Sequence, residues 1–256
     1  MYRGSRRHVL DWTGSPSFLS ELARVLEPAP VEFPAGTIFM PCGENAPEEA
    51  RLEHFGPRLR PGPAAWREIA DWWLCHKSGA NTPNWDIAVG CEIEGRPGLV
   101  LVEAKANWPE LGVAGKAIAA DASERSRENH ERIGAAIEEA RRGWCALDPR
   151  VSISRDSHYQ LANRLAFTWK LASLGIPVVM LYLGFTGDDG ISDAGAPFVD
   201  DADWQGAFRG YSADVVPRDL FERRLVICST PCWLLSHSRP VLGLSPRRTP
   251  RSGPGK

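Results

Sequence analysis

The stretch NWDIAVGCEIEGRPGLVLVEAK, residues 84–105, decides the fold. It contains two apolar runs of strand length with a glycine-containing turn near Gly95 between them, which predicts a β-hairpin with strands over 85–94 and 98–105. The second strand is apolar on both faces, as in the centre of a sheet. It nevertheless ends in Glu103-Ala104-Lys105, so charged side chains emerge from a buried element.

The hairpin brings an aspartate to the same end. Side chains alternate along a strand, so Glu103 and Lys105 share one face. A two-residue turn at Gly95 and Arg96 places Asp86 opposite Lys105, and a slightly longer loop moves the pairing by a residue or two. In each register we expect these charged side chains to converge within roughly 5 to 8 Å at the open end of the hairpin.

This arrangement suggests a metal site. Two carboxylates so close together repel each other unless a cation lies between them. Mg²⁺ or Mn²⁺ takes oxygen ligands and keeps several waters for a substrate, and Lys105 beside it could stabilise a hydroxide or hold a phosphate. The pattern favours metal-assisted phosphodiester hydrolysis. The alternative interpretation is a solvated strand end, with Asp86 as a turn residue.

On these residues the chain resembles the PD-(D/E)XK nuclease superfamily. The order of predicted elements is also similar: a helix over 63–78, the hairpin, a helical region and a strand over 177–183. The resemblance implies a restriction-endonuclease-like core and metal coordination by Asp86 and Glu103. It implies the Ala104 carbonyl as a further ligand and Lys105 as a catalytic group. The family's proline usually precedes the aspartate directly, whereas here two residues separate Pro83 from Asp86.

The resemblance also suggests supporting residues on two predicted helices. Glu68, on the helix predicted over 63–80, is the candidate for an additional metal ligand. On the helix predicted over 157–175, with Ser157 as its cap, Gln160 matches a catalytic glutamine of exonuclease-like members. Asn163 and Arg164 follow on the same face as candidate substrate-binding residues, and Arg164 could hold a phosphate. The tyrosine that those members place after the glutamine is absent.

The fold class that we predict is α/β, with a central mixed β-sheet flanked by helices and a restriction-endonuclease-like core. Residues 1–62 are expected to be an N-terminal extension packed on the core, with a loose start over 1–15 and a helix over 15–26. Residues 63–236 form the nuclease-like core. It contains a charged helix over 122–143, which Gly143 would stop, and an acidic insert near 186–204. Residues 237–256 are expected to be a basic, disordered tail.

Composition limits the classes of protein. No apolar run approaches the ~18 residues of a membrane helix, and no signal-type segment follows the N-terminus. The cysteines lack a CxxC pair, which favours free thiols and, with the missing signal, a cytoplasmic protein without a membrane partner. The formal net charge is −2, and the tail is basic, so the body is more acidic than the total. This balance gives no broad basic footprint for nucleic acid.

These observations lead to one main functional hypothesis and two alternatives. The main one is a metal-dependent phosphodiester hydrolase, a nuclease using Mg²⁺ or Mn²⁺ that acts on DNA or, less favoured, RNA. The first alternative is a catalytically inactive nuclease-fold module for binding or assembly. The second is an unrelated α/β domain in which the pattern at Asp86, Glu103 and Lys105 is a coincidence. The oligomeric state is left open.

Overall fold

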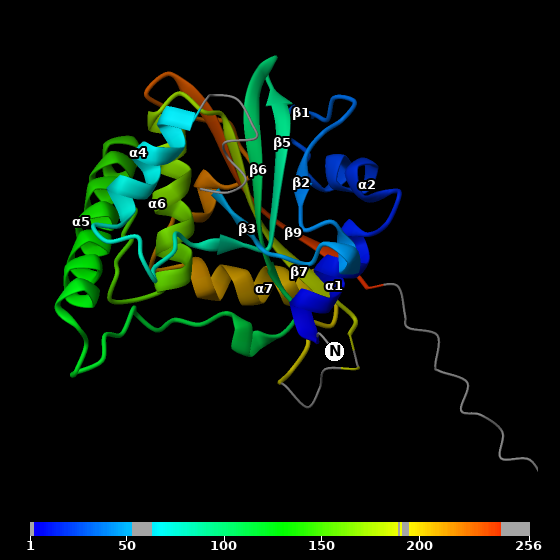
Figure 1. The fold of residues 1–256 in the computed structure, drawn as a ribbon. Coiled ribbons are helices and arrows are strands. Elements are labelled where there is room, and N and C mark those ends of the chain that lie inside the picture. Colours follow the sequence, from blue (N-terminus) through cyan, green and yellow to red (C-terminus); the bar gives the residue numbers. More distant parts are fainter. Residues whose placement is uncertain (1–2, 53–62, 189, 191–194, 242–256) are drawn as a thin grey trace, which may run out of the picture.

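A mixed β-sheet organises the chain. The computed structural model describes residues 3–52, 63–188, 190 and 195–241 of the 256 residues. The main sheet has the strand order β1-β5-β6-β7-β9-β8, and β2 also pairs with β5 (Figure 1). Its strands are β1 (Val31–Glu32), β2 (Phe39–Met40), β5 (Ile87–Ile93), β6 (Arg96–Lys105), β7 (Val178–Thr186), β8 (Leu225–Ile227) and β9 (Thr230–Pro240). A separate two-stranded sheet pairs β3 (Ala50–Arg51) with β4 (Asn84–Trp85).

Helices cover both faces of the main sheet (Figure 1). They are α1 (Gly4–Thr13), α2 (Phe18–Val25), α4 (Pro63–Trp73), α5 (Glu124–Leu147), α6 (Tyr159–Ser173) and α7 (Asp201–Ser212), with short 3-10 turns η1 (Gly43–Asn45), η3 (Trp108–Glu110) and η5 (Arg218–Leu220). Helices α4 to α7 pack on the face that carries Leu99 and Leu101, and α1 and α2 pack on the face that carries Val100 and Val102. The predicted class, a mixed sheet flanked by helices, is confirmed.

The hairpin forms as predicted, but its register is shifted. Strands β5 and β6 pair antiparallel from Ile87↔Val102 to Ile93↔Arg96, so the turn consists of Glu94 and Gly95 instead of Gly95 and Arg96. Both turn residues have positive φ, 51° and 70°. This left-handed pair matches the twist of the two strands, which is why it is favoured in two-residue hairpins. If this pairing is continued by one residue, Asp86 lies opposite Glu103 instead of opposite Lys105.

The segment before residue 52 belongs to the sheet architecture. The predicted loose start is wrong, because residues 4–13 form α1 and bury Val9 and Trp12 against the sheet. The predicted helix 15–26 is confirmed over its central part as α2. Strands β1 and β2 then add to β5, and α1 and α2 close one sheet face.

Two helix ends differ from the prediction for identifiable reasons. Helix α4 ends at Trp73 because the chain turns away to contact Asn129, whose side chain binds both the backbone N–H and the carbonyl of His76, each at 2.8 Å. Helix α5 continues through Gly143 to Leu147. A Cβ on Gly143 would lie 1.8 Å from Nε1 of Trp169, so this glycine permits close helix packing and does not end the helix.

Three further boundaries are corrected. Helix α6 is preceded by His158 in the left-handed region (φ 46°), so Ser157 is not its N-cap. The acidic insert predicted at 186–204 ends in a helix, because the side chain of Asp200 caps α7 by accepting from the N–H of Asp203 at 3.0 Å. Residues 189 and 191–194 lie outside the described residues. The tail begins later than predicted, because 237–240 pair with β7 as part of β9, and 242–256 lie outside the described residues.

No helix in the described ranges is long and apolar enough to cross a membrane. The structure contains Cys42, Cys75, Cys91, Cys145, Cys228 and Cys232 as free cysteines.

Candidate functional site

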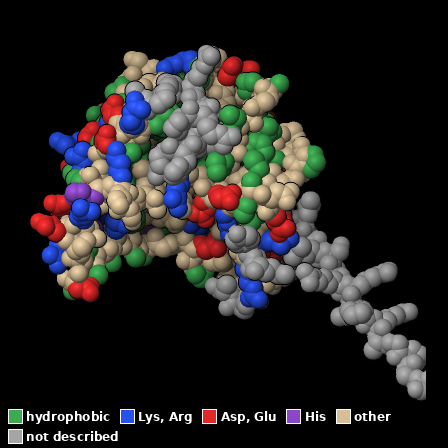
Figure 2. Space-filling model, in the orientation of Figure 1, with side chains coloured by type: hydrophobic (Ala, Val, Ile, Leu, Met, Phe, Trp, Pro, Cys, Tyr) green, Lys and Arg blue, Asp and Glu red, His purple; other side chains and the backbone are tan. Residues whose placement is uncertain are grey.

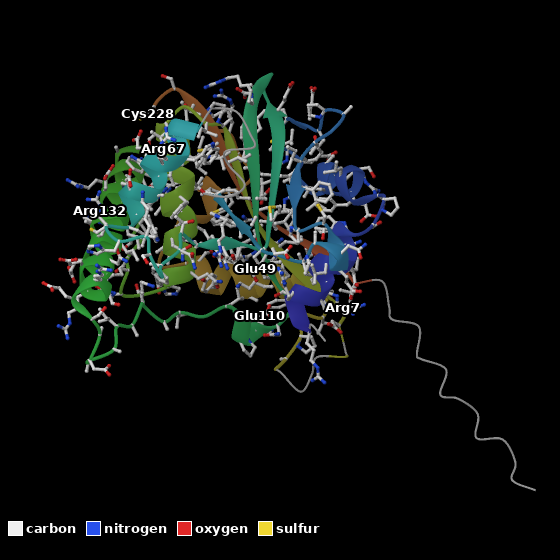
Figure 3. All side chains as sticks on the ribbon, viewed as in Figure 1. Arg7, Glu49, Arg67, Glu110, Arg132 and Cys228 are labelled. Atoms are coloured by element: carbon white, nitrogen blue, oxygen red, sulfur yellow. The ribbon has the colours of Figure 1, made fainter. Side chains whose placement is uncertain are left out.

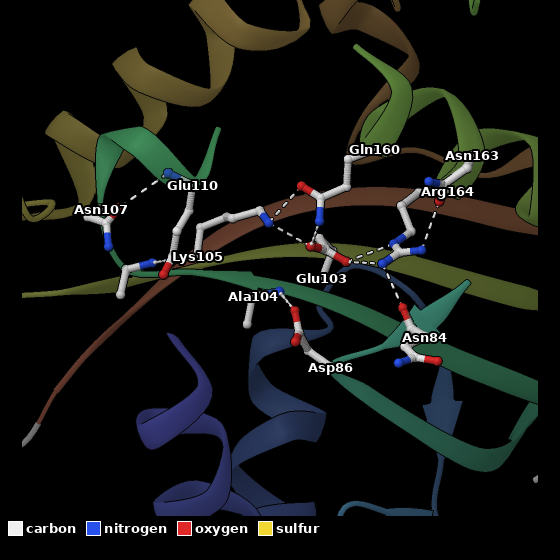
Figure 4. Close-up of polar contacts among 11 residues, drawn as sticks. Asn84, Asp86, Glu103, Ala104, Lys105, Asn107, Glu110, Gln160, Asn163 and Arg164 are labelled. Carbon is white, nitrogen blue, oxygen red and sulfur yellow. Dashed lines mark hydrogen bonds and ion pairs between the residues drawn. The ribbon is translucent and has the colours of Figure 1, made fainter. Parts of the chain in front are cut away.

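The carboxyl end of β6 carries two charged side chains into the protein interior. Glu103 is 2% exposed and Lys105 is 5% exposed. Both follow Leu99 and Leu101 on the sheet face that α6 covers, because alternate residues of a strand share a face. The polar side chains of α6 therefore meet the end of β6 directly (Figure 4).

Glu103 is the centre of this polar cluster. Its Oε1 accepts from Nζ of Lys105 and from Nε2 of Gln160, both at 2.6 Å. Its Oε2 accepts from Arg164 Nε at 2.7 Å and lies 2.6 Å from Arg164 Nη2. A carboxylate offers about four lone-pair positions. Glu103 thus uses its full accepting capacity within the protein.

Arg164 is fixed from several sides. Besides Glu103, its guanidinium donates to the carbonyl of Asn84 at 2.7 Å and to Oδ1 of Asn163 at 2.8 Å. It also lies over the ring of Trp85, 4.4 Å from the centroid. A planar guanidinium with this many partners has little freedom to move. By contrast, Lys105 has one further partner in the described residues, Oε1 of Gln160 at 2.8 Å.

The two carboxyl groups have opposite electrostatic environments. Burial raises the pKa of Glu103, but the adjacent Arg164 and Lys105 outweigh burial and hold its pKa below the usual value. Asp86 Oδ2 accepts from the backbone N–H of Ala104 at 2.8 Å. Burial and the neighbouring Glu103 carboxylate raise the pKa of Asp86 to about 7. Asp86 therefore titrates near neutral pH while Glu103 stays ionised.

A cleft of about 570 Å³ opens beside the cluster. Its walls combine the end of the hairpin, one face of α6 and loop segments. They are formed by Glu49, Trp73, Asn81, Thr82, Pro83, Asn84, Asp86, Glu103, Lys116, Ile133, Tyr159, Gln160, Asn163 and Arg164. Glu49, seen near the centre of Figure 3, accepts from Asn84 Nδ2 at 2.8 Å and adds a third carboxylate to the cleft. The site is thus open to a ligand and mainly polar.

The structure brings most of the predicted site residues together. Glu103, Lys105, Gln160 and Arg164 form one hydrogen-bonded network, with Asn163 held by Arg164 and Asp86 joined to the same strand end through the N–H of Ala104. Ala104 contacts Asp86 through its N–H.

Glu68 is the predicted residue that the structure does not bring to the network. Its carboxylate lies on α4, 3.3 Å from Nζ of Lys170, and Glu68 is not among the residues that line the cleft.

Several residues of the cleft were not predicted. Asn84 and Trp85 hold Arg164, and Lys116 and Glu49 line the walls. Asn84 and Trp85 directly precede Asp86, so their place in the opening stretch was a usable signal. Glu49 and Lys116 reach the cleft from irregular segments, where no periodic pattern indicates the direction of a side chain.

Neither the charges on the face that Figure 2 shows nor the potential metal ligands among the described residues gather into one large group. Acidic and basic side chains are interspersed on the face shown in Figure 2, without a continuous basic band. Within the described residues, no group of three or more His, Cys, Asp or Glu side chains is arranged to hold a metal ion. A cation at the hairpin would therefore need backbone or substrate oxygens as ligands in addition to the two carboxylates.

Comparisons with known proteins found no match: no protein-family model matches the chain, and no curated protein or solved structure is significantly similar to it.

Proposed function

We propose that this protein is a metal-dependent phosphodiester hydrolase, a nuclease of the PD-(D/E)XK type acting on DNA in preference to RNA. The observation that carries the proposal is that Asp86, Glu103 and Gln160 line one polar cleft, with Lys105 hydrogen-bonded to both Glu103 and Gln160. The sheet order β5-β6-β7-β9, with an antiparallel hairpin next to parallel strands, supports a restriction-endonuclease-like core. The free cysteines support a cytoplasmic location.

The donor set fits Mg²⁺ or Mn²⁺ under one condition. Asp86 and Glu103 supply carboxylate oxygens, the ligand type that these cations prefer, and the Ala104 carbonyl is the third ligand that we assign. Both oxygens of Glu103 already accept two N–H groups each. Glu103 must therefore release donors before it can bind a cation. Lys105 and Gln160 are the donors to release, since Arg164 is anchored by Asn84, Asn163 and Trp85 as well.

Each residue then has a role that its contacts support. Asp86 and Glu103 would hold the cation, and Arg164 keeps the Glu103 carboxylate ionised and oriented. Lys105, once released from Glu103, stabilises negative charge on the attacking oxygen, and Gln160 orients the lysine through its Oε1. Asn163 and Arg164 contribute polar groups to the substrate wall. A divalent cation bound here would supply Lewis-acid activation of the phosphodiester.

The test is cleavage by purified protein with four variants. Supercoiled plasmid, single- and double-stranded DNA and RNA are incubated with Mg²⁺, Mn²⁺ or chelator. We expect cation-dependent cleavage by the wild type and at least about 10²-fold less by Asp86→Asn, Glu103→Gln and Lys105→Met. Glu68→Gln is the matched control, because Glu68 lies outside the cleft, and it should cleave like the wild type. Cleavage that survives Glu103→Gln would overturn the assignment.

A second function is favoured by the fact that both carboxylate oxygens of Glu103 already accept hydrogen bonds within the protein. Four N–H contacts compensate its charge without a cation, as expected of a structural cluster in an inactive nuclease-fold binding module. Calorimetric titration with Mn²⁺ separates the two functions. Binding that Glu103→Gln abolishes supports the hydrolase. No binding even with a substrate oligonucleotide present, together with partner binding that Asp86→Asn and Glu103→Gln leave intact, supports the module.

A further inference from the structure

Lys116 differs from the other lysines that the structure describes. Lys77 pairs with Asp71, Lys105 with Glu103 at 2.6 Å and Lys170 with Glu68 at 3.3 Å. Lys116 forms no ion pair with any described carboxylate. Its Nζ instead lies 4.9 Å from the ring centroid of Tyr159. A ring face stabilises an ammonium group without neutralising its charge, so Lys116 still has a full charge to offer a ligand.

The backbone around Lys116 is held firmly against the start of α6. The N–H of Lys116 donates to the carbonyl of Arg155 at 2.8 Å, and the preceding residues form a β-bridge, Ala114↔Ser157. Gly115 lies so close that a Cβ there would be 2.4 Å from the carbonyl oxygen of Asp156. The position of Lys116 is therefore set by the fold, even though the residue lies in an irregular segment between β6 and α5.

This fixed cation lines the same cleft as the carboxylates. Glu103, Asp86 and Glu49 face the cleft, and so do Gln160 and Lys116. Partial burial desolvates the ammonium group and lowers the pKa of Lys116, and none of the described carboxylates forms an ion pair with it. An ammonium group without a paired carboxylate in this cleft is available to an anionic ligand.

We propose that Lys116 binds a backbone phosphate of the nucleic acid substrate and so positions the strand beside Glu103. This inference rests on the proposed nuclease function and adds a substrate-positioning residue to it. An ammonium group with three donors is suited to a phosphate oxygen, and phosphate contacts set the register of a nucleic acid on a protein. A single fixed contact of this kind also fits the face shown in Figure 2, where acidic and basic side chains are interspersed.

The experiment measures binding of labelled single-stranded and duplex DNA as a function of salt. Ca²⁺ replaces Mg²⁺ so that substrate binds without being consumed. For Lys116→Met we expect about tenfold weaker binding and a slope of log K against log [salt] that is smaller by roughly 0.7 to 0.9, the value for one lost phosphate contact. Lys116→Arg should restore both. Lys77→Met is the control, because it removes the same charge outside the cleft.

Separate readouts distinguish this proposal from the proposed function. Mn²⁺ affinity and thermal stability should be the same for Lys116→Met and wild type, and KM for cleavage should rise while kcat changes little. If wild type cleaves DNA and Lys116→Met matches Lys77→Met in affinity and salt slope, the role of Lys116 is wrong and the nuclease function stands. If wild type neither binds nor cleaves any nucleic acid, both proposals are wrong.

Discussion

The two faces of β6 bury side chains of opposite character. On one face, Val100 and Val102 pack against apolar side chains of α1 and α2. On the other, Leu99 and Leu101 continue into Glu103 and Lys105, which are just as buried. The apolar face is stabilised by the close packing of buried side chains. The charged end is stable only while its hydrogen-bonding partners from α6 remain in place. We therefore expect substitutions on the apolar face of β6 to be tolerated better than substitutions at its charged end.

The largest effect that we expect comes from Glu103→Ala. This change leaves Arg164 buried without its carboxylate, so the free energy of unfolding should fall by about 3 to 5 kcal/mol. Chemical denaturation with an unchanged m-value would measure it. The double variant Glu103→Leu/Arg164→Met, with an apolar pair of similar volume, should recover part of the loss. A loss below about 1 kcal/mol for Glu103→Ala would mean that water solvates the cluster.

Val102→Ala tests the apolar face one residue away. Removing two methyl groups from a fully buried side chain should cost about 2 kcal/mol, including the small cavity that remains. Because Val102 points toward α1 and α2, DNA cleavage below the melting temperature should be unchanged. The comparison fails if Val102→Ala reduces cleavage as strongly as Glu103→Gln does.

The raised pKa of Asp86 predicts two opposite pH dependences. In the unfolded chain this carboxyl titrates near 3.8, and in the fold near 7, so the folded state holds the proton more tightly. Its contribution to stability is complete below about pH 4 and is lost as the pH rises through about 7. The unfolding free energy of Asp86→Asn should accordingly vary less between pH 4 and 7 than that of wild type.

Cation binding follows the reverse trend, because a metal ligand must be deprotonated. With a pKa of about 7, Asp86 is about tenfold more ionised at pH 8 than at pH 6. Calorimetry should show Mn²⁺ binding about tenfold tighter at the higher pH, equivalent to ~1.4 kcal/mol. Affinity that does not change with pH would exclude Asp86 as the titrating ligand.

Among the substitutions on β6, the smallest effect on stability is expected for Lys105→Met. Glu103 keeps Arg164 and Gln160 in this variant, so the unfolding free energy should fall by only about 1 kcal/mol. Cleavage should nevertheless be lost, and Mn²⁺ should bind several-fold more tightly because one competing donor has been removed from Glu103. Weaker Mn²⁺ binding in Lys105→Met would contradict the release of this lysine before cation binding.

The sequence predicted the elements that have a clear periodicity and missed those that depend on distant contacts. The hairpin, α6 and β7 follow from apolar patterns, and the convergence of Asp86, Glu103 and Lys105 follows from their spacing, whereas Gln160 and Arg164 were expected from the resemblance to a known family. The two-residue shift in pairing arose because the turn uses Glu94, a residue type that is unusual at positive φ. Glycine patterns misled at Gly143, where a tryptophan from another helix makes the glycine necessary.

Other features of the fold and of the site could not be predicted from local sequence patterns. The segment before Thr13 is polar and basic in composition, yet the sheet face provides the apolar surface that orders it as α1. Lys116 reaches the cleft because the β-bridge between Ala114 and Ser157 holds its segment against the start of α6. The sequence around Lys116 gives no sign of this contact. Glu68 has suitable chemistry, but α4 turns it toward Lys170.

The position of β9 has a consequence for how the chain folds during synthesis. β9 pairs with β7 along its length, yet 43 residues separate the end of β7 from the start of β9. Until the ribosome has released residues 230–240, β7, which is buried along its whole length in the fold, presents an unpaired and largely apolar strand edge to other chains. Nascent chains that stop before this point contain every residue of the polar network but should aggregate. We therefore expect a shortened chain to be expressed without aggregation only if it includes β9, which lies far in sequence from the residues of the cleft.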